Sequence, residues 1–401
     1  MSGSPAIVTV GRTRFGEHYE REPERLIEEA WLKASGEASM ERRDLEACYL
    51  SDYFLTITNK LGLEEGFLSE LTELHVPMEV NRSFSSALLN ACNAIQAGRY
   101  DVVLVGGLEK MTDRWDKIRD DLMLLEDPWS YYAGCTPEAN HDLMFRAYVK
   151  RHGLEGRDLN KLNQALAHIS VKNHLHAMKN EYAQFQREIT VEKVLNARRR
   201  AGKPLGFYDF APISDGAAVL VLTNEQEAHE FTDTPVYVQG SASATDYLTF
   251  PARRDMTHFM VSEQAMEDAL KKSGVKRRDI QVAEIYDQST LMEMVSLEDL
   301  GFCKPGNAWR DIYRSCQDYQ GYYEVEDGEK LFVNTNGGLK ADGNPLGAAG
   351  GAQIFEVFRQ LRGEAGQRQV ETDEEPRNGC ILEMVGFGTK GYVYVLGRDQ
   401  L

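Results

Sequence analysis

The sequence predicts an α/β fold made of two similar halves, because strand-like and helix-like segments alternate along the chain and two sequence blocks recur. A charged turn followed by an apolar strand stands at residues 41–52 and again at 276–287. Later in each half a strand-like segment ends in Val-Asn, at 80–81 and 333–334, and a helix rich in small residues follows. Two blocks in the same order indicate an internal duplication.

We expect the boundary between the halves near residues 225–232, where a charged stretch precedes a new strand. The N-terminal half is then 1–230 and the C-terminal half 231–401. A charged, mostly helical insertion at about 112–205 interrupts the first half. An insertion of this length between two strands is typical of a functional lid or subdomain, and a structural buttress is the alternative.

The charge of the chain argues against nucleic-acid binding. The 401 residues carry a net charge of -18, whereas phosphate backbones are bound by clustered Lys and Arg. The nearest basic run is 198–200 with Lys203. It has two interpretations, a solvent-exposed loop or a contact with the phosphates of a ligand such as CoA.

The six cysteines indicate neither a disulfide scaffold nor a metal site, because they are scattered without C-x-x-C or zinc-ligand spacing. The first residues lead directly into a strand-like segment at 6–10, and no apolar stretch approaches the roughly 18 residues of a membrane span. We therefore expect a cytoplasmic protein that does not enter a membrane.

Four sequence blocks point to a known family. They span most of the chain in the family's order, at residues 91–111, 214–218, 284–303 and 333–347, and the last is followed by 360–364. With these blocks the chain resembles the thiolase superfamily. It is most similar to the branch of sterol-carrier-protein thiolases and lipid-transfer proteins that also includes archaeal thiolases.

The resemblance implies the thiolase fold, in which two similar halves form a five-layer α-β-α-β-α sandwich with an inserted loop domain. It also implies that an acyl-CoA binds in a tunnel beneath that loop domain, with no permanently bound cofactor. Family members are usually dimers, so a homodimer is expected. Several members of this branch work with a small zinc-ribbon/OB-fold protein, so such a partner is expected as well.

The resemblance places a nucleophilic cysteine just before the helix that ends near Gly98. One alignment of the family pattern puts Asn81 at that position, and another puts Phe84 there. Neither alignment supplies a cysteine. Cys92 lies about three helical turns beyond Asn81, so packing is its expected role. A thiolate at a helix N-terminus is what thiolase chemistry requires, and we predict that it is missing.

The family's two catalytic histidines are also replaced. The His-Asp-x-Phe motif reads Tyr-Asp-Gln-Ser at 286–289, and the Gly-His-Pro motif reads Gly-Asn-Pro at 343–345. None of the nine histidines lies after His258. The histidine or cysteine of the C-terminal glycine-rich segment is replaced by Glu383-Met384, ahead of Gly386 and Gly388.

These positions define the candidate site. Tyr286 is the candidate acid/base, because a buried phenol can shuttle a proton, and the Asn344 and Asn81 amides can polarise a carbonyl but cannot attack it. The candidate substrate-binding residues are Asp287, Phe84, Gly343, Gly386 and Gly388. The glycines have a second interpretation, close helix–strand packing.

Three functions stay open at this point. The first is non-covalent carbon–carbon bond chemistry on a CoA thioester, of the retro-aldol or aldol type, because retro-aldolases of this branch have a tyrosine at the position of Tyr286. The second is an inactive homologue that carries acyl-CoA or lipid, or that serves as a subunit of a complex. The third is an acyltransferase of the thiolase or Claisen type that works by an unorthodox route.

Overall fold

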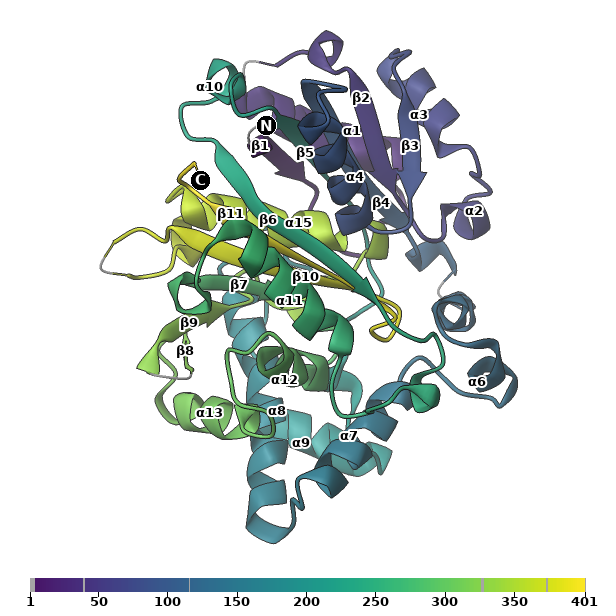
Figure 1. Cartoon of the computed structure of the whole chain (residues 1–401). Helices are drawn as coiled ribbons and strands as arrows, with labels where there is room; N and C mark the ends of the chain where they lie inside the picture. Colours follow the sequence, from purple (N-terminus) through teal and green to yellow (C-terminus); the bar gives the residue numbers. More distant parts are fainter. Residues whose placement is uncertain (1–3, 39, 115, 326–327, 373, 401) are drawn as a thin grey trace.

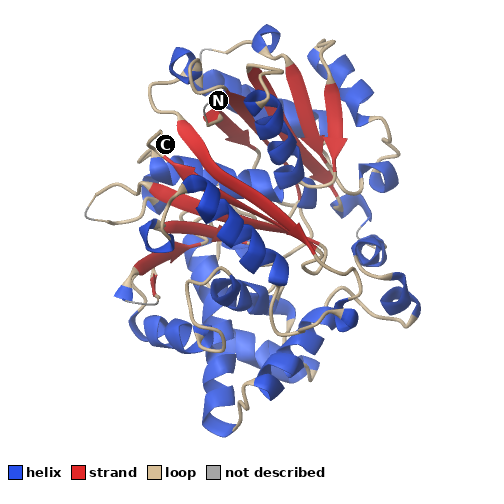
Figure 2. Cartoon of the chain, viewed as in Figure 1, coloured by secondary structure: helices blue, strands red, loops and turns tan. Residues whose placement is uncertain are grey.

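The computed structural model describes residues 4–38, 40–114, 116–325, 328–372 and 374–400. Its strands form one hydrogen-bonded sheet in the order β3-β2-β4-β5-β1-β6-β11-β10-β7-β9-β8 (Figures 1 and 2). The strands are β1 Ala6–Arg12, β2 Ala47–Ser51, β3 Met78–Asn81, β4 Val102–Lys110, β5 Asp215–Thr223, β6 Val236–Thr245, β7 Val282–Ile285, β8 Tyr323–Glu324, β9 Lys330–Val333, β10 Asn378–Val385 and β11 Lys390–Gly397.

The α-helices lie on both faces of this sheet (Figure 2). They are α1 Pro23–Glu37, α2 Leu55–Thr58, α3 Glu64–Thr72, α4 Phe84–Gln96, α5 Ile118–Asp121, α6 Pro128–Tyr132, α7 Ala139–Arg151, α8 Gly156–Ala177, α9 Val191–Ala201, α10 Ala228–Phe231, α11 Met260–Ser273, α12 Thr290–Asp299, α13 Ala308–Ser315, α14 Gly338–Ala341 and α15 Leu346–Leu361. In the part of the chain that the structure describes, none of them combines the length and apolarity that a membrane crossing requires.

The strand order confirms the duplication. The first half-sheet runs β3-β2-β4-β5-β1 and the second runs β9-β7-β10-β11-β6, which is the same order when the strands of each half are counted from its start and the two-residue edge strand β8 is left out. The pairing directions also agree, because β2 and β7 pair in parallel with both neighbours and the remaining pairs are antiparallel. The recurring charged turn forms a 3₁₀ turn in each half, Arg42–Asp44 before β2 and Arg277–Asp279 before β7.

The two half-sheets meet where β1 pairs with β6, and they enclose a central helical layer (Figure 1). Helix α15 contacts strands of both half-sheets and also α4, and all its residues except Arg359 are buried. A helix that is apolar on all sides is expected in such a position. Helix α1 covers the outer face of the first half-sheet and α11 that of the second, which gives the five predicted layers.

The predicted insertion folds back onto the C-terminal half (teal, below the sheet in Figure 1). It connects β4 to β5 and contains α5 to α9. Its longest helix, α8, is held by buried polar contacts: Lys172 pairs with Glu293 at 2.7 Å, and the Asn173 amide donates to Asp287 at 2.6 Å. Part of the insertion is therefore fixed as a buttress against the half that carries the Tyr-Asp-Gln-Ser motif.

A buried ion pair fixes the loop that carries Asn344. The Arg12 guanidinium donates to both carboxylate oxygens of Asp342, at 2.6 and 2.9 Å, and also stacks 4.0 Å from the centre of the Phe15 ring. Asp342 accepts a further bond from Asn180 at 3.1 Å. Strand β1 of the first half thereby ties down the Gly-Asn-Pro segment of the second.

Removal of one partner from this pair should be costly. Asp342→Ala leaves the Arg12 charge buried without its partner, so we expect the free energy of unfolding to fall by about 3–5 kcal/mol. Glu28→Ala is the matched control, because it breaks the surface pair with Arg25 and should cost less than about 1 kcal/mol. Urea denaturation measures both, and equal losses would contradict the assignment.

Candidate active site

The start of α4 is formed by Phe84, not by Asn81. Ser83 caps this helix, with its Oγ accepting from the Ser86 amide at 3.2 Å. The Phe84 ring is fully buried against Gly107 and Gly351, where an added Cβ would lie within 2.7 Å of a ring carbon. Asn81 ends the edge strand β3. Its Oδ1 accepts a hydrogen bond from the Asn90 amide at 2.6 Å, in an exposed contact between the two side chains.

Buried cysteines offer no thiolate near this helix. Cys92 lies on α4 in the apolar central core, and burial raises the pKa of its thiol to about 12. Burial likewise raises the pKa of Cys48, Cys316 and Cys380 to about 12. At neutral pH these four groups are protonated thiols, which are poor nucleophiles.

A buried carboxylate stands at the helix start instead. Glu383 lies on β10, and its Oε2 accepts the Ser85 amide of α4 at 2.7 Å. Gly350 makes room for it, because a Cβ there would lie 2.5 Å from Oε2. Burial raises the pKa of Glu383 to about 7, although bonds from Ser85 and Phe84 lower it. The sequence identified Glu383 only as a replacement for a histidine or cysteine of the family, and no functional role was assigned to its carboxylate.

Tyr286 and Asn344 come together beside this carboxylate. Burial raises the pKa of Tyr286 well above 10, the charge of Glu383 raises it further, and a hydrogen bond from the Asn344 side chain opposes both. The phenol is therefore protonated at neutral pH. The backbone amide of Asn344 donates to Ser214 Oγ at 2.9 Å, which fixes its position, while its Oδ1 is buried without a partner among the described residues.

Asp287 has a clear structural task. Its carboxylate accepts the backbone amides of Leu339 and Lys340, at 2.6 and 3.2 Å, and so holds the first turn of α14. Asn173 of the insertion donates to the same carboxylate. The structure thus places Asp287 against the turn formed by Gly337 and Gly338, and a direct contact with substrate stays a prediction.

The three candidate glycines are required by packing. Gly343, Gly386 and Gly388 all have positive φ, at 123°, 61° and 69°. A Cβ at Gly386 would lie 2.6 Å from the Leu125 carbonyl oxygen, and one at Gly388 would meet the Phe259 ring at 2.2 Å. Protein contacts alone explain these glycines, so their predicted role in substrate binding has no separate support.

A cavity of about 690 Å³ is lined by the insertion, by the segment around Tyr19 and by loops of the C-terminal half. This volume suits a small-molecule ligand. Asn344 lies in its wall, together with Gln288, Lys340 and His141. His141 comes from α7 of the insertion, and no motif in the sequence singles it out.

The basic run divides between two environments. Arg198 is on α9, not in a loop, and its guanidinium pairs with the buried Asp209. Lys203 lines the cavity, as does Arg119. Of this run, Lys203 is therefore the residue in a position to meet a ligand phosphate.

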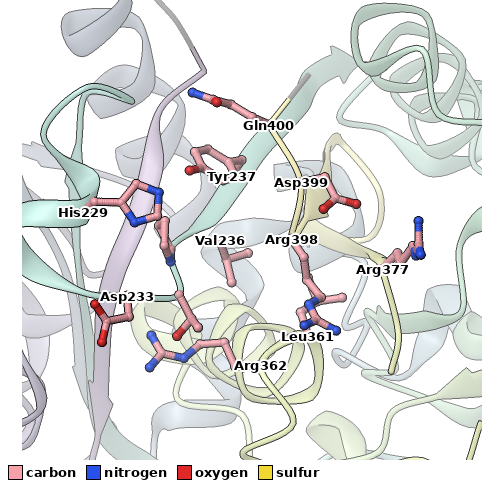
Figure 3. Close-up of a pocket in the computed structure, with 12 residues that line it drawn as sticks. His229, Asp233, Val236, Tyr237, Leu361, Arg362, Arg377, Arg398, Asp399 and Gln400 are labelled. Atoms are coloured by element: carbon pink, nitrogen blue, oxygen red, sulfur yellow. The ribbon is translucent and has the colours of Figure 1, made fainter. Parts of the chain in front are cut away.

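A second cavity, of about 420 Å³, is formed where β6 begins and β11 ends (Figure 3). It shares no lining residue with the first cavity. Three arginines line it, and each pairs with a glutamate: Arg362 with Glu364, Arg377 with Glu374 and Arg398 with Glu375. Its positive charge is thus compensated, and none of the candidate catalytic residues lies in its wall.

The raised pKa of Glu383 predicts a pH-dependent stability. Because the folded pKa of about 7 exceeds the ordinary 4.5, the contribution of Glu383 is fully present below pH 4.5 and is lost as the pH rises through 7. Relative to Glu383→Gln, the wild type should therefore lose on the order of 3 kcal/mol of unfolding free energy over this range. Urea denaturation of both proteins at several pH values measures it, and parallel curves would refute the titration.

Comparisons with known proteins agree with this architecture. Residues 6–198 match the thiolase N-terminal domain family, and residues 242–398 match the thiolase C-terminal domain-like family. The chain is 35% identical to the acetyl-CoA acetyltransferase of Methanothermobacter thermautotrophicus, over 98% of this chain and 99% of the relative. It is 30% identical to sterol carrier protein 2 of Gallus gallus, over 91% of this chain and 67% of that protein.

A solved structure shares the fold. The Ltp2-ChsH2(DUF35) aldolase superposes with a TM-score of 0.79 at 23% sequence identity, over 99% of this chain and 98% of that chain. Together, the two matched domain families, the sequence relatives and the repeated half-sheets assign the chain. It belongs to the thiolase family, in the branch of the sterol-carrier-protein thiolases and lipid-transfer proteins.

Proposed function

We propose that this protein binds an acyl-CoA thioester and makes or breaks a carbon–carbon bond in it without forming an acyl-enzyme. The observation that carries the proposal is the start of α4, where a buried phenylalanine and a carboxylate stand at the place that the resemblance assigns to a nucleophilic cysteine. A carboxylate with a pKa of about 7, whose charge acts on a protonated phenol, is suited to proton transfer.

The retro-aldol direction uses these groups as follows. The β-hydroxyl of a 3-hydroxyacyl-CoA gives its proton to the Tyr286 oxygen as that phenol passes its own proton to Glu383. The Cα–Cβ bond breaks, Cβ becomes a carbonyl carbon, and the electron pair moves to Cα as a thioester enolate. The proton held by Glu383 returns through Tyr286 to Cα. The products are an aldehyde or ketone and a shortened acyl-CoA.

Asn344 supplies the electrostatic part of this proposal. Its amide can donate to the thioester oxygen, on which negative charge develops in the enolate. The hydroxyl of Ser214 and the Arg12–Asp342 pair hold its backbone in place, so little reorganisation is needed during the reaction. Asn81 lies at the edge strand, and its proposed contribution has no support from the site.

The comparisons favour an acyl-CoA ligand but leave the reaction open. One relative is an acetyl-CoA acetyltransferase, and one structural neighbour is an aldolase. The runner-up function is an inactive homologue that carries acyl-CoA or lipid, or that acts as a subunit. It predicts ligand binding without turnover and no effect of Tyr286→Phe on that binding.

The third candidate function is an acyltransferase that works by an unorthodox route. It predicts acyl transfer to a second thiol or CoA.

We also propose a protein partner. The aldolase neighbour is named as a complex of Ltp2 with ChsH2(DUF35). A small zinc-ribbon/OB-fold partner is therefore proposed for this chain too, in addition to a homodimer. Assays of activity should include such a partner protein where one is found.

Tyr286→Phe tests the proton transfer. It removes one oxygen from the site, so cleavage of a 3-hydroxyacyl-CoA should slow by about 10²–10⁴-fold. Tyr148→Phe is the matched control, because Tyr148 is also buried but its hydroxyl contacts Glu298, at 2.7 Å. Release of the shortened acyl-CoA is followed by liquid chromatography. Equal rates for the wild type and Tyr286→Phe would contradict the proposal.

The absence of an acyl-enzyme can be tested directly. After incubation with radiolabelled acyl-CoA and rapid acid quenching, we expect no label on Cys48, Cys92, Cys316 or Cys380, because burial raises the pKa of each of these thiols to about 12. A peptide carrying an acylated Cys92 would overturn the non-covalent route, even if the retro-aldol products were found.

A further inference from the structure

A histidine from the insertion stands in the wall of the large cavity. His141 is in the first turns of α7 and is 1% exposed. Its ring makes edge contacts with Phe387 and Phe210, with ring centres 4.6 and 5.2 Å apart. It lines the same cavity as Asn344 and Gln288. The insertion thus brings an imidazole to the site whose own motifs contain none.

The hydrogen bonding of His141 favours one position for the ring proton. His141 Nδ1 lies 2.8 Å from the Ser289 Oγ. That oxygen already accepts the Met292 amide, at 3.3 Å, as the N-cap of α12. The Ser289 hydroxyl hydrogen has no other acceptor among the described residues, which favours the arrangement in which it donates to Nδ1. The ring hydrogen of His141 is then on Nε2.

The bond to Ser289 is the only hydrogen bond of the His141 ring within the described ranges, and the ring lines the cavity. A donor on the wall of a cavity can bind a ligand oxygen there without giving up a protein hydrogen bond. Burial lowers the pKa of His141 to about 3, so the ring stays neutral and keeps its donor at working pH.

The place of His141 indicates which oxygen it meets. Its partner Ser289 ends the motif that begins with Tyr286, and Asn344, whose side chain hydrogen-bonds Tyr286, lines the same cavity as His141. Neutral imidazoles donate to carbonyl oxygens in this way in other enzymes. We propose that His141 Nε2–H binds the β-oxygen of a 3-hydroxyacyl or 3-oxoacyl-CoA. This inference rests on the proposed acyl-CoA site and names its substrate class.

Two substitutions separate the two nitrogens of the ring. Glutamine places its amide near the Nε2 position, so His141→Gln keeps a donor toward the cavity but loses the bond to Ser289. Asparagine places its amide near the Nδ1 position, so His141→Asn keeps the Ser289 contact and loses the donor. A purely structural histidine would be better replaced by Asn, and a ligand-binding one by Gln.

The measurement is the dissociation constant of 3-hydroxybutyryl-CoA relative to butyryl-CoA, determined by calorimetry. In the wild type the β-oxygen should tighten binding about threefold to tenfold, as one neutral hydrogen bond does. We expect His141→Gln to keep this ratio and His141→Asn to bring it to about one, with butyryl-CoA binding unchanged in both. A ratio near one in the wild type, or an unchanged ratio in His141→Asn, would overturn the inference.

A spectroscopic test on the unmodified protein covers the case in which a variant does not fold. With ¹⁵N-labelled histidine, the His141 nitrogens should report a neutral ring protonated at Nε2, and 3-hydroxybutyryl-CoA should shift the Nε2 resonance more than butyryl-CoA does. Protonation at Nδ1, or equal shifts, would refute it. Because both tests measure binding, a lack of cleavage would defeat the proposed reaction but leave this inference standing.

Discussion

The contact between the Glu383 carboxylate and the first turn of α4 is the interaction on which the site depends. The amide of Ser85 donates to this carboxylate, and the positive end of the helix faces it. A helix start of this kind can stabilise any anion. Here burial holds the anion at a pKa of about 7, so the group can both take and give a proton near neutrality. The Cys92 thiol, whose pKa burial raises to about 12, stays protonated at this pH and does not act as a nucleophile.

The duplicated architecture is what allows this contact. Glu383 belongs to the second half-sheet and α4 to the first half, and they meet because both half-sheets pack on one central layer. Gly350 and Gly351 on α15 leave the space that the Glu383 carboxylate and the Phe84 ring fill. The Asn344 loop is likewise fixed across the two halves, through Arg12 and Asp342. The site therefore requires the whole double fold and cannot be assembled by either half alone.

The sequence predicted the parts that local patterns encode. The recurring turn-and-strand blocks became β2 and β7, and the motif positions of Tyr286 and Asn344 proved to be neighbours. It left Asn81 and Phe84 open as the nucleophile position, because both lie within four residues of Val80, and the structure separates them by placing Asn81 at the end of β3 and the buried Phe84 at the start of α4. Glu383 and His141 have no local motif. Their roles arise from contacts with residues about 300 and 150 positions away.

The most direct test of the account is a structure of the protein with a bound, uncleavable 3-hydroxyacyl-CoA analogue. The account predicts a continuous, non-covalent ligand in the large cavity beneath the insertion. Its thioester oxygen should lie within hydrogen-bond distance of Asn344 and its β-oxygen near Tyr286. A sulfur of the protein bonded to the acyl group, or a ligand bound outside this cavity, would contradict it.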